Sequence, residues 1–170
     1  LAAGSVSAQD DNTLSVEGET MISTTDAPSH MENVGTIYSG WHFRSSETQA
    51  LQTDDFDNPG MVFVDQAIDE WDVVDGSEGK ACSSCHEDVA AFEGLRTQLP
   101  RVDDGQLVTM ENLINECRTD RMGAEAWKYS GTDMTGMTAL ISLQSRGLPM
   151  NVAIDGDAAD FWEKGKELYY

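Results

Sequence analysis

Cys82, Cys85 and His86 lie close enough in sequence to act together in one chemical site. They form a C-x-x-C-H run, which is the attachment sequence of c-type heme. Two thiols three residues apart add to the two vinyl groups of one porphyrin, and the adjacent imidazole then binds the iron. The run therefore predicts one covalently attached heme c, with His86 as an axial ligand of its iron.

Other uses of a cysteine pair stay open at this point. A C-x-x-C pair is also typical of thiol redox sites, and a disulfide between Cys82 and Cys85 is the least favoured alternative. Half of a zinc site would need further Cys or His ligands, and the chain offers only Cys117, His30 and His42. We expect the two histidines to lie on the surface or to make local hydrogen bonds.

The second axial ligand has several candidates. In small c-type cytochromes it is commonly a methionine downstream of the heme-binding run, and four methionines lie at suitable distances: Met122, Met134, Met137 and Met150. A methionine at helical spacing is, however, more often a core residue. The residues alone leave these methionines, Cys117 and an open coordination position as alternatives.

Cys117 is the third cysteine of a chain that carries an apparent export signal, and an unpaired cysteine there needs an explanation. Arg118 and Arg121 are close enough in sequence to lower the pKa of its thiol toward the thiolate form. The same two arginines could instead pair with the heme propionates or form surface salt bridges. The remaining alternative for Cys117 is a buried thiol without a chemical role.

Four helical patterns must position these groups. The first begins at Asn58 and Pro59, and the second is capped by Thr109 and ends near Gly123. The third runs over 133–145 and the fourth over 160–170. Their apolar stripes are Met61, Val64, Ile68 and Trp71 in the first, Met110, Leu113, Ile114 and Cys117 in the second, and Met134, Met137, Leu140 and Ile141 in the third. Alternating strand patterns are lacking, so we expect a mainly α protein.

Composition limits the function classes. The chain has 170 residues, of which 39% are hydrophobic, and its 31 acidic and 10 basic residues give a net charge of -21. Such a charge excludes a protein that binds nucleic acid through phosphate contacts. The acidic excess fits either a solvated surface or a docking face for a basic partner. No apolar run is long enough to span a membrane.

The sequence divides into four parts. Residues 1–8 have the small-residue pattern that precedes a signal-peptide cleavage site, and the chain does not begin with Met. Residues 9–35 are polar and acidic, and we expect an irregular extension. We expect the heme domain over 36–150 and a linker with the start of another domain over 151–170.

The chain resembles the SoxA family of c-type cytochromes along most of residues 35–170. The resemblance rests on eight segments in the same order: Ser39–Arg44, Thr48–Gln52, Asp54–Phe56, Asn58–Met61, Gly79–His86, Ile114–Thr119, Gln144–Pro149 and Phe161–Tyr170. It implies a cytochrome c-like helical domain with a long irregular N-terminal extension. It also implies heme bound at Cys82, Cys85 and His86, with Cys117 as the distal axial ligand.

The resemblance further implies a place in periplasmic sulfur oxidation. SoxA pairs with the smaller cytochrome SoxX, and together they oxidatively join thiosulfate to a cysteine of the carrier SoxYZ. A thiolate ligand favours ferric iron and a low potential, because it donates more charge than a thioether does.

One departure from the family pattern bears on activity. The helix over 165–170 resembles the helix that leads into a second C-x-x-C-H run, and the 170 residues include no such run. We therefore expect the N-terminal heme domain of a SoxA or a free-standing relative of it, and no sulfur transfer by these residues alone. The alternative is a monoheme electron carrier or accessory subunit of another redox complex.

Overall fold

The computed structural model describes residues 13–169, and the predicted signal-peptide remnant over 1–8 lies outside this range. The chain divides into two compact units, with the division after Met61. The domain boundaries predicted at residues 35 and 150 stay predictions.

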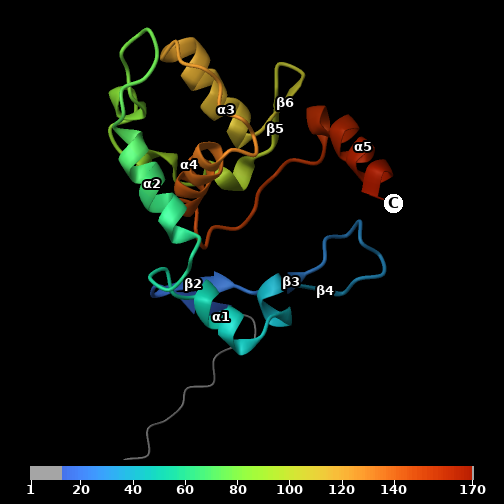
Figure 1. The fold of residues 1–170 in the computed structure, drawn as a ribbon. Coiled ribbons are helices and arrows are strands. Elements are labelled where there is room, and N and C mark those ends of the chain that lie inside the picture. Colours follow the sequence, from blue (N-terminus) through green and yellow to red (C-terminus); the bar gives the residue numbers. More distant parts are fainter. Residues whose placement is uncertain (1–12, 170) are drawn as a thin grey trace, which may run out of the picture. The chain divides into compact units, whose positions relative to one another are not determined.

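The first unit consists of short strands and one short helix. Two antiparallel hairpins pair β1 (Thr13–Val16) with β2 (Glu19–Ile22) and β3 (Thr24–Asp26) with β4 (Thr36–Tyr38). A 3₁₀ turn over Gly40–Phe43 and helix α1 (Ser46–Gln52) follow, as Figure 1 shows. The side chain of Ser45 caps α1 by accepting a hydrogen bond from the backbone N–H of Thr48.

These hairpins differ from the irregular segment that the sequence predicts over 9–35. In β1, Leu14 and Val16 are buried while Ser15 between them is exposed, which is the alternation of a half-buried strand. The alternation covers only four residues and is too short to stand out from a polar background. Pairing also satisfies backbone groups that an isolated extended segment would leave to water.

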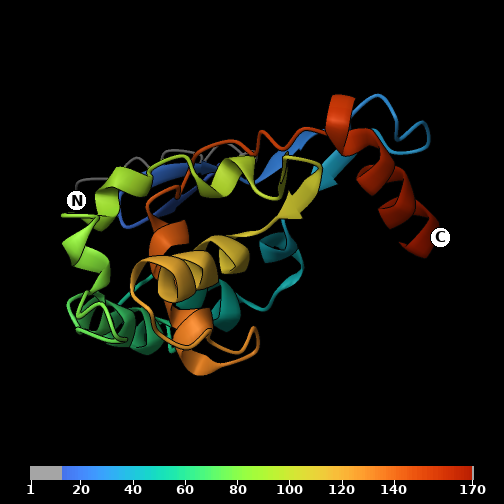
Figure 2. The ribbon, with the colours of Figure 1, turned by 90° about the horizontal axis from the view of Figure 1, so that it is seen from above.

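The second unit is built around helices. α2 (Met61–Trp71), α3 (Met110–Glu116), α4 (Thr132–Leu143) and α5 (Ala159–Tyr169) confirm the four helical patterns. Their ends agree to within about two residues, except that α3 ends at Glu116 and a π-helical turn over Cys117–Arg121 continues toward the predicted end near Gly123. A hairpin of β5 (Arg101–Asp103) and β6 (Gln106–Val108) precedes α3. α3 packs on α4, and α5 stands apart from both in the two views of Figures 1 and 2.

The core of this unit follows the predicted stripes, apart from Ile68 and the half-buried Met61, Leu113 and Cys117. All four apolar residues predicted on α4 are buried, and Met134 and Met137 are among the most buried side chains of the described residues. On α2 the buried residues are Val64, Ala67 and Trp71, whereas Ile68 is half exposed. The stripe of α2 is therefore rotated toward Ala67, because a small residue allows α4 to approach closely.

Gly136 makes that approach possible. A Cβ atom at this position would lie 2.7 Å from the backbone oxygen of Phe63 and 3.6 Å from Cβ of Ala67. The α2–α4 contact thus depends on the missing side chain of one glycine. None of the helices between residues 13 and 169 combines the length and apolar character needed to cross a lipid bilayer.

Candidate functional site

One pocket of about 620 Å³ in the second unit collects the predicted site residues. Cys82, Cys85, His86 and Cys117 all line it. Most of the remaining wall is apolar, and helices α2, α3 and α4 all contribute to it. A pocket of this size, mainly apolar with a few chemically active side chains, is typical of a cofactor site.

The heme-binding run has a tight local structure. Residues Cys82–Ser84 form a 3₁₀ turn, and the backbone N–H groups of Cys85 and His86 both donate to the carbonyl oxygen of Cys82, at 3.2 and 3.0 Å. Ser84 Oγ accepts a hydrogen bond from the backbone N–H of Ala81 at 2.9 Å. These bonds curl the run, so that both thiols and the imidazole reach one pocket.

Aromatic rings hold the imidazole of His86. The ring centroid of Phe92 lies 4.8 Å from that of His86, and the centroid of Trp71 lies 6.3 Å from it. Trp71 and Phe92 also meet edge to face at 6.0 Å. His86 is therefore oriented by α2 on one side and by the turn over Val89–Phe92 on the other.

Cys117 stands where α3 changes its geometry. The chain passes into a π-helical turn over Cys117–Arg121, in which the N–H of Met122 donates to the oxygen of Cys117 at 3.2 Å. The sequence predicts Cys117 on one stripe with Met110, Leu113 and Ile114, and all four residues line the pocket. The regular α-helix expected through Cys117 instead ends at Glu116. Single π turns are frequent at functional sites because they redirect side chains that a regular helix would place elsewhere.

Burial, with a smaller contribution from the nearby charge of Cys85, raises the pKa of the Cys117 thiol. Arg121 and Arg118 oppose this effect, as the sequence predicts, but burial outweighs them. Burial also raises the pKa of Cys82. Without a metal Cys117 is thus a neutral thiol, and binding iron as a thiolate would release a proton.

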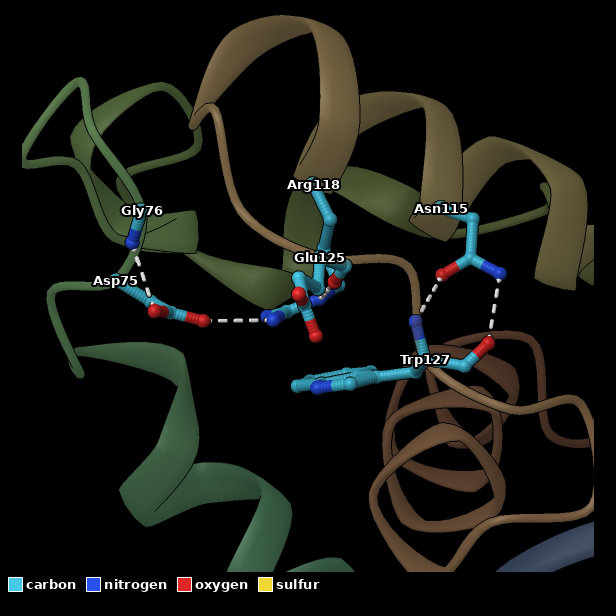
Figure 3. Close-up of polar contacts among 6 residues, drawn as sticks. All are labelled: Asp75, Gly76, Asn115, Arg118, Glu125 and Trp127. Carbon is cyan, nitrogen blue, oxygen red and sulfur yellow. Dashed lines mark hydrogen bonds and ion pairs between the residues drawn. The ribbon is translucent and has the colours of Figure 1, made fainter.

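Arg118 makes contacts with two separate segments (Figure 3). Its Nη2 lies 2.6 Å from Oδ2 of Asp75, and its Nε donates to the backbone oxygen of Glu125 at 3.0 Å. Its guanidinium also stacks over Trp127, with Cζ 4.0 Å from the ring centroid. The salt-bridge alternative therefore describes Arg118, although the pair is mostly buried on the arginine side. Arg121 lines the same pocket and is exposed.

Asn115, two residues before Cys117, also binds the segment over 125–127. Its amide donates to the backbone oxygen of Trp127 at 3.0 Å and accepts from the backbone N–H of Trp127 at 2.8 Å (Figure 3). The residues two before and one after Cys117 are thus both bound to the segment over 125–127.

The loop that precedes the heme-binding run is joined to the turn that follows Cys117. The N–H groups of Ser77 and Glu78 donate to the oxygens of Gly123 and Met122 at 3.2 and 3.0 Å. Lys80 Nζ donates to the oxygen of Arg121 at 3.2 Å. The two segments that carry the candidate ligands are consequently one connected structure.

The four methionines considered as axial ligands differ in whether they line the pocket. Met122 and Met137 are buried and line the pocket. Met134 is fully buried and is not part of the pocket wall, and Met150 is 63% exposed and lies outside it. The ring of His42 meets the rings of Tyr38 and Trp41 edge to face, and His42 belongs to the first unit and does not line the pocket.

Sequence reasoning missed Phe92, Asp75, Asn115 and Trp127 as parts of the site. Asp75 and Trp127 lie in segments without periodicity, so no pattern singles them out. Trp127 is a single tryptophan two residues after Glu125, and such a pattern does not by itself indicate a functional residue. Their roles follow from tertiary contacts alone.

Comparisons with known proteins agree with this geometry. The family described as SoxA/TsdA, cytochrome c domain, matches residues 66–150. The chain belongs to this family. An L-cysteine S-thiosulfotransferase subunit SoxA of Paracoccus pantotrophus is 53% identical over 137 residues, and that of Rhodovulum sulfidophilum is 49% identical over 175 residues. These matches cover 79% and 100% of this chain but 47% and 61% of the relatives, so the chain spans about half to three-fifths of their length.

A solved structure gives the same result for the fold. The crystal structure of SoxXA from P. pantotrophus matches with a TM-score of 0.87 and 46% identity, over 95% of this chain and 63% of that one. The mainly α, cytochrome c-like fold class is thereby confirmed. The cofactor of the family's cytochrome c domain is heme c, as the C-x-x-C-H run predicts.

The residues present fit that cofactor. All three cysteines are free thiols, so Cys82 and Cys85 are available for thioether formation. Trp71 lines the pocket, and its buried indole N–H has no acceptor among residues 13–169. A buried donor without a partner is costly, and a bound group that carries carboxylates could supply the acceptor.

Proposed function

We propose that the chain binds one heme c through thioether bonds to Cys82 and Cys85, with His86 and Cys117 as the two axial ligands. Convergence of these four side chains on one mainly apolar pocket is the observation that carries the proposal. The family resemblance favours Cys117 over Met122 and Met137, which line the same pocket. The heme supplies one-electron redox chemistry when bound, and the chain's residues attach it, exclude water from it and hold its ligands.

We further propose that this heme serves the reaction after which the relatives are named. The chain acts as the N-terminal heme domain of SoxA in the periplasm, pairs with SoxX, and takes part in joining thiosulfate to a cysteine of the SoxYZ carrier. The matched SoxXA structure supports SoxX as the partner. In this proposal residues 36–150 form the heme domain and residues 151–170 lead toward a further domain.

The ligand set explains the electronic role proposed for the domain. A thiolate opposite an imidazole stabilises ferric iron and lowers the reduction potential. A heme of low potential is a poor acceptor for electrons leaving thiosulfate. We therefore assign it a structural or electron-storing role and place the sulfur chemistry outside residues 13–169.

Copurification and spectroscopy test the proposal together. The chain is coexpressed with a SoxX subunit and the heme-maturation proteins, and heme content, copurification and the low-spin ferric electron paramagnetic resonance spectrum are measured. We expect one heme per chain, a thiolate-type spectrum and a stable complex with SoxX. A heme-loaded chain with a methionine-type spectrum would contradict the ligand assignment, and a chain that does not bind SoxX would contradict the proposed complex.

A further inference from the structure

Arg118 stands out among the charged residues. Within the described range 13–169 it is the only charged side chain that is buried, at 5% exposure. Removing a guanidinium from water is costly unless ion pairing and hydrogen bonds compensate. A buried charge directly after Cys117 suggests a functional role for Arg118, and the contacts of its guanidinium indicate that role.

The contacts of Arg118 fix the turn that carries Cys117. Asp75 belongs to the loop before the heme-binding run, whereas Glu125 and Trp127 belong to the segment after the π turn. A planar guanidinium can pair with a carboxylate, donate to a carbonyl oxygen and stack on an indole at the same time, and a lysine cannot. Arg118 therefore joins the segment that leads to His86 to the segment that presents Cys117 (Figure 3).

The charge of Arg118 also reaches the pocket. Its side chain lines the pocket, and Asp75 does not. Arg118 directly follows Cys117 in the chain, and both residues line the same pocket. The side chain of Asp75 is 46% exposed, so water screens its charge more strongly than that of Arg118. Of the two charges, that of Arg118 therefore acts more strongly on the pocket, because Arg118 lines it and is less screened by water than Asp75.

We propose that Arg118 is the positioning residue of the heme centre and that the Arg118–Asp75 pair sets the reduction potential of the heme. This inference rests on the proposed heme ligation at His86 and Cys117. A buried cation stabilises the reduced heme, which carries one more negative charge than the oxidised heme. Loss of the cation makes reduction harder, and loss of the balancing carboxylate makes it easier.

Opposite shifts in two variants test this. The heme-loaded full chain is prepared as wild type, Arg118→Gln, Asp75→Asn and Arg118→Lys, with Arg101→Gln as the matched control. Arg101 pairs with Asp103 at 2.8 Å on β5, but both side chains are about half exposed and neither lines the pocket. The reduction potential is measured by spectroelectrochemistry, and the electron paramagnetic resonance spectrum reports ligation.

We expect Arg118→Gln to lower the potential and Asp75→Asn to raise it, each by up to about tenfold in the reduction equilibrium, which is about 59 mV for one electron. Arg118→Lys keeps the charge and should restore most of the potential, while its ligation signals broaden because the stacking on Trp127 is lost. Arg101→Gln should change neither. A purely structural role would move the potentials of Arg118→Gln and Asp75→Asn in the same direction.

Shifts in the same direction, or no shift in either variant, would overturn the inference. If Arg118→Gln yields no folded hemoprotein, Asp75→Asn decides alone: a raised potential supports the inference and an unchanged one refutes it. Failure of the proposed function looks different, because the wild-type protein itself would then lack heme or a thiolate signature.

Discussion

Gly76 lies at a close contact between the two ligand-bearing segments, and replacing it by alanine tests their connection. Its φ is +75°, a conformation that costs an L-residue about 1–2 kcal/mol. A Cβ atom would also stand 2.6 Å from the backbone N of Ala124 and 2.7 Å from the carbonyl carbon of Gly123, with the oxygen of Met122 closer still. Backbone atoms cannot move aside cheaply, and overpacking of this kind costs about 1–3 kcal/mol more.

Gly76→Ala should therefore lower the free energy of unfolding by about 2–5 kcal/mol, measured by urea denaturation of the heme-loaded chain. Gly105 provides a matched control, because its φ is also +75° but no atom lies within 4 Å of its Cβ position. Gly105→Ala should lower the free energy of unfolding only by the cost of the positive φ, about 1–2 kcal/mol. Equal losses in the two variants would refute the argument that the loop over 75–78 is pressed onto the turn over 122–124.

Three further changes test other parts of the account. Cys117→Ala should leave the heme attached, because attachment needs only the other two cysteines, but should raise the potential and alter the low-spin ferric spectrum; an unaltered spectrum would refute the ligand assignment. Gly136→Ala should destabilise the fold by about 1–2 kcal/mol in urea, since the contact with Phe63 outweighs the gain in helix propensity, whereas Gly165→Ala on α5, where no atom lies within 4 Å, should not. Burial, with smaller contributions from Asp133 and Asp75, raises the pKa of Glu70 against the opposing charge of Arg118, so its ionised form opposes folding. Glu70→Gln should therefore raise the free energy of unfolding slightly at neutral pH, measured by urea denaturation. The gain should vanish in acid, where Glu70 is protonated in both the folded and the unfolded chain; an equal gain at both pH values would contradict this.

The sequence predicts most of the helical framework because its signals are local. The Thr109 cap, whose hydroxyl accepts from the N–H of Asn112 at 3.4 Å, lies where the pattern places it, and the buried face of α4 has all four predicted residues. The heme-binding run is likewise local, since its spacing is set by the chemistry of one porphyrin.

What the sequence does not predict depends on contacts between distant residues. The π turn at Cys117 coincides with contacts of Asn115 and Arg118 to the segment over 125–127, and no helical periodicity encodes those contacts. The direction that the sequence predicts for the pKa of Cys117 is wrong for a related reason. Neighbouring arginines are visible in the sequence, whereas burial is a property of the folded pocket.

A peptide map of the native protein tests the central claim most directly. Trypsin cleaves after Lys80, Arg96, Arg101 and Arg118, so it releases peptide 81–96 with Cys82 and Cys85 and peptide 102–118 with Cys117. We predict that peptide 81–96 carries the mass of one heme and absorbs in the Soret band, and that peptide 102–118 carries a free thiol. Peptide 81–96 without heme, or with its two cysteines joined in a disulfide, would contradict the account.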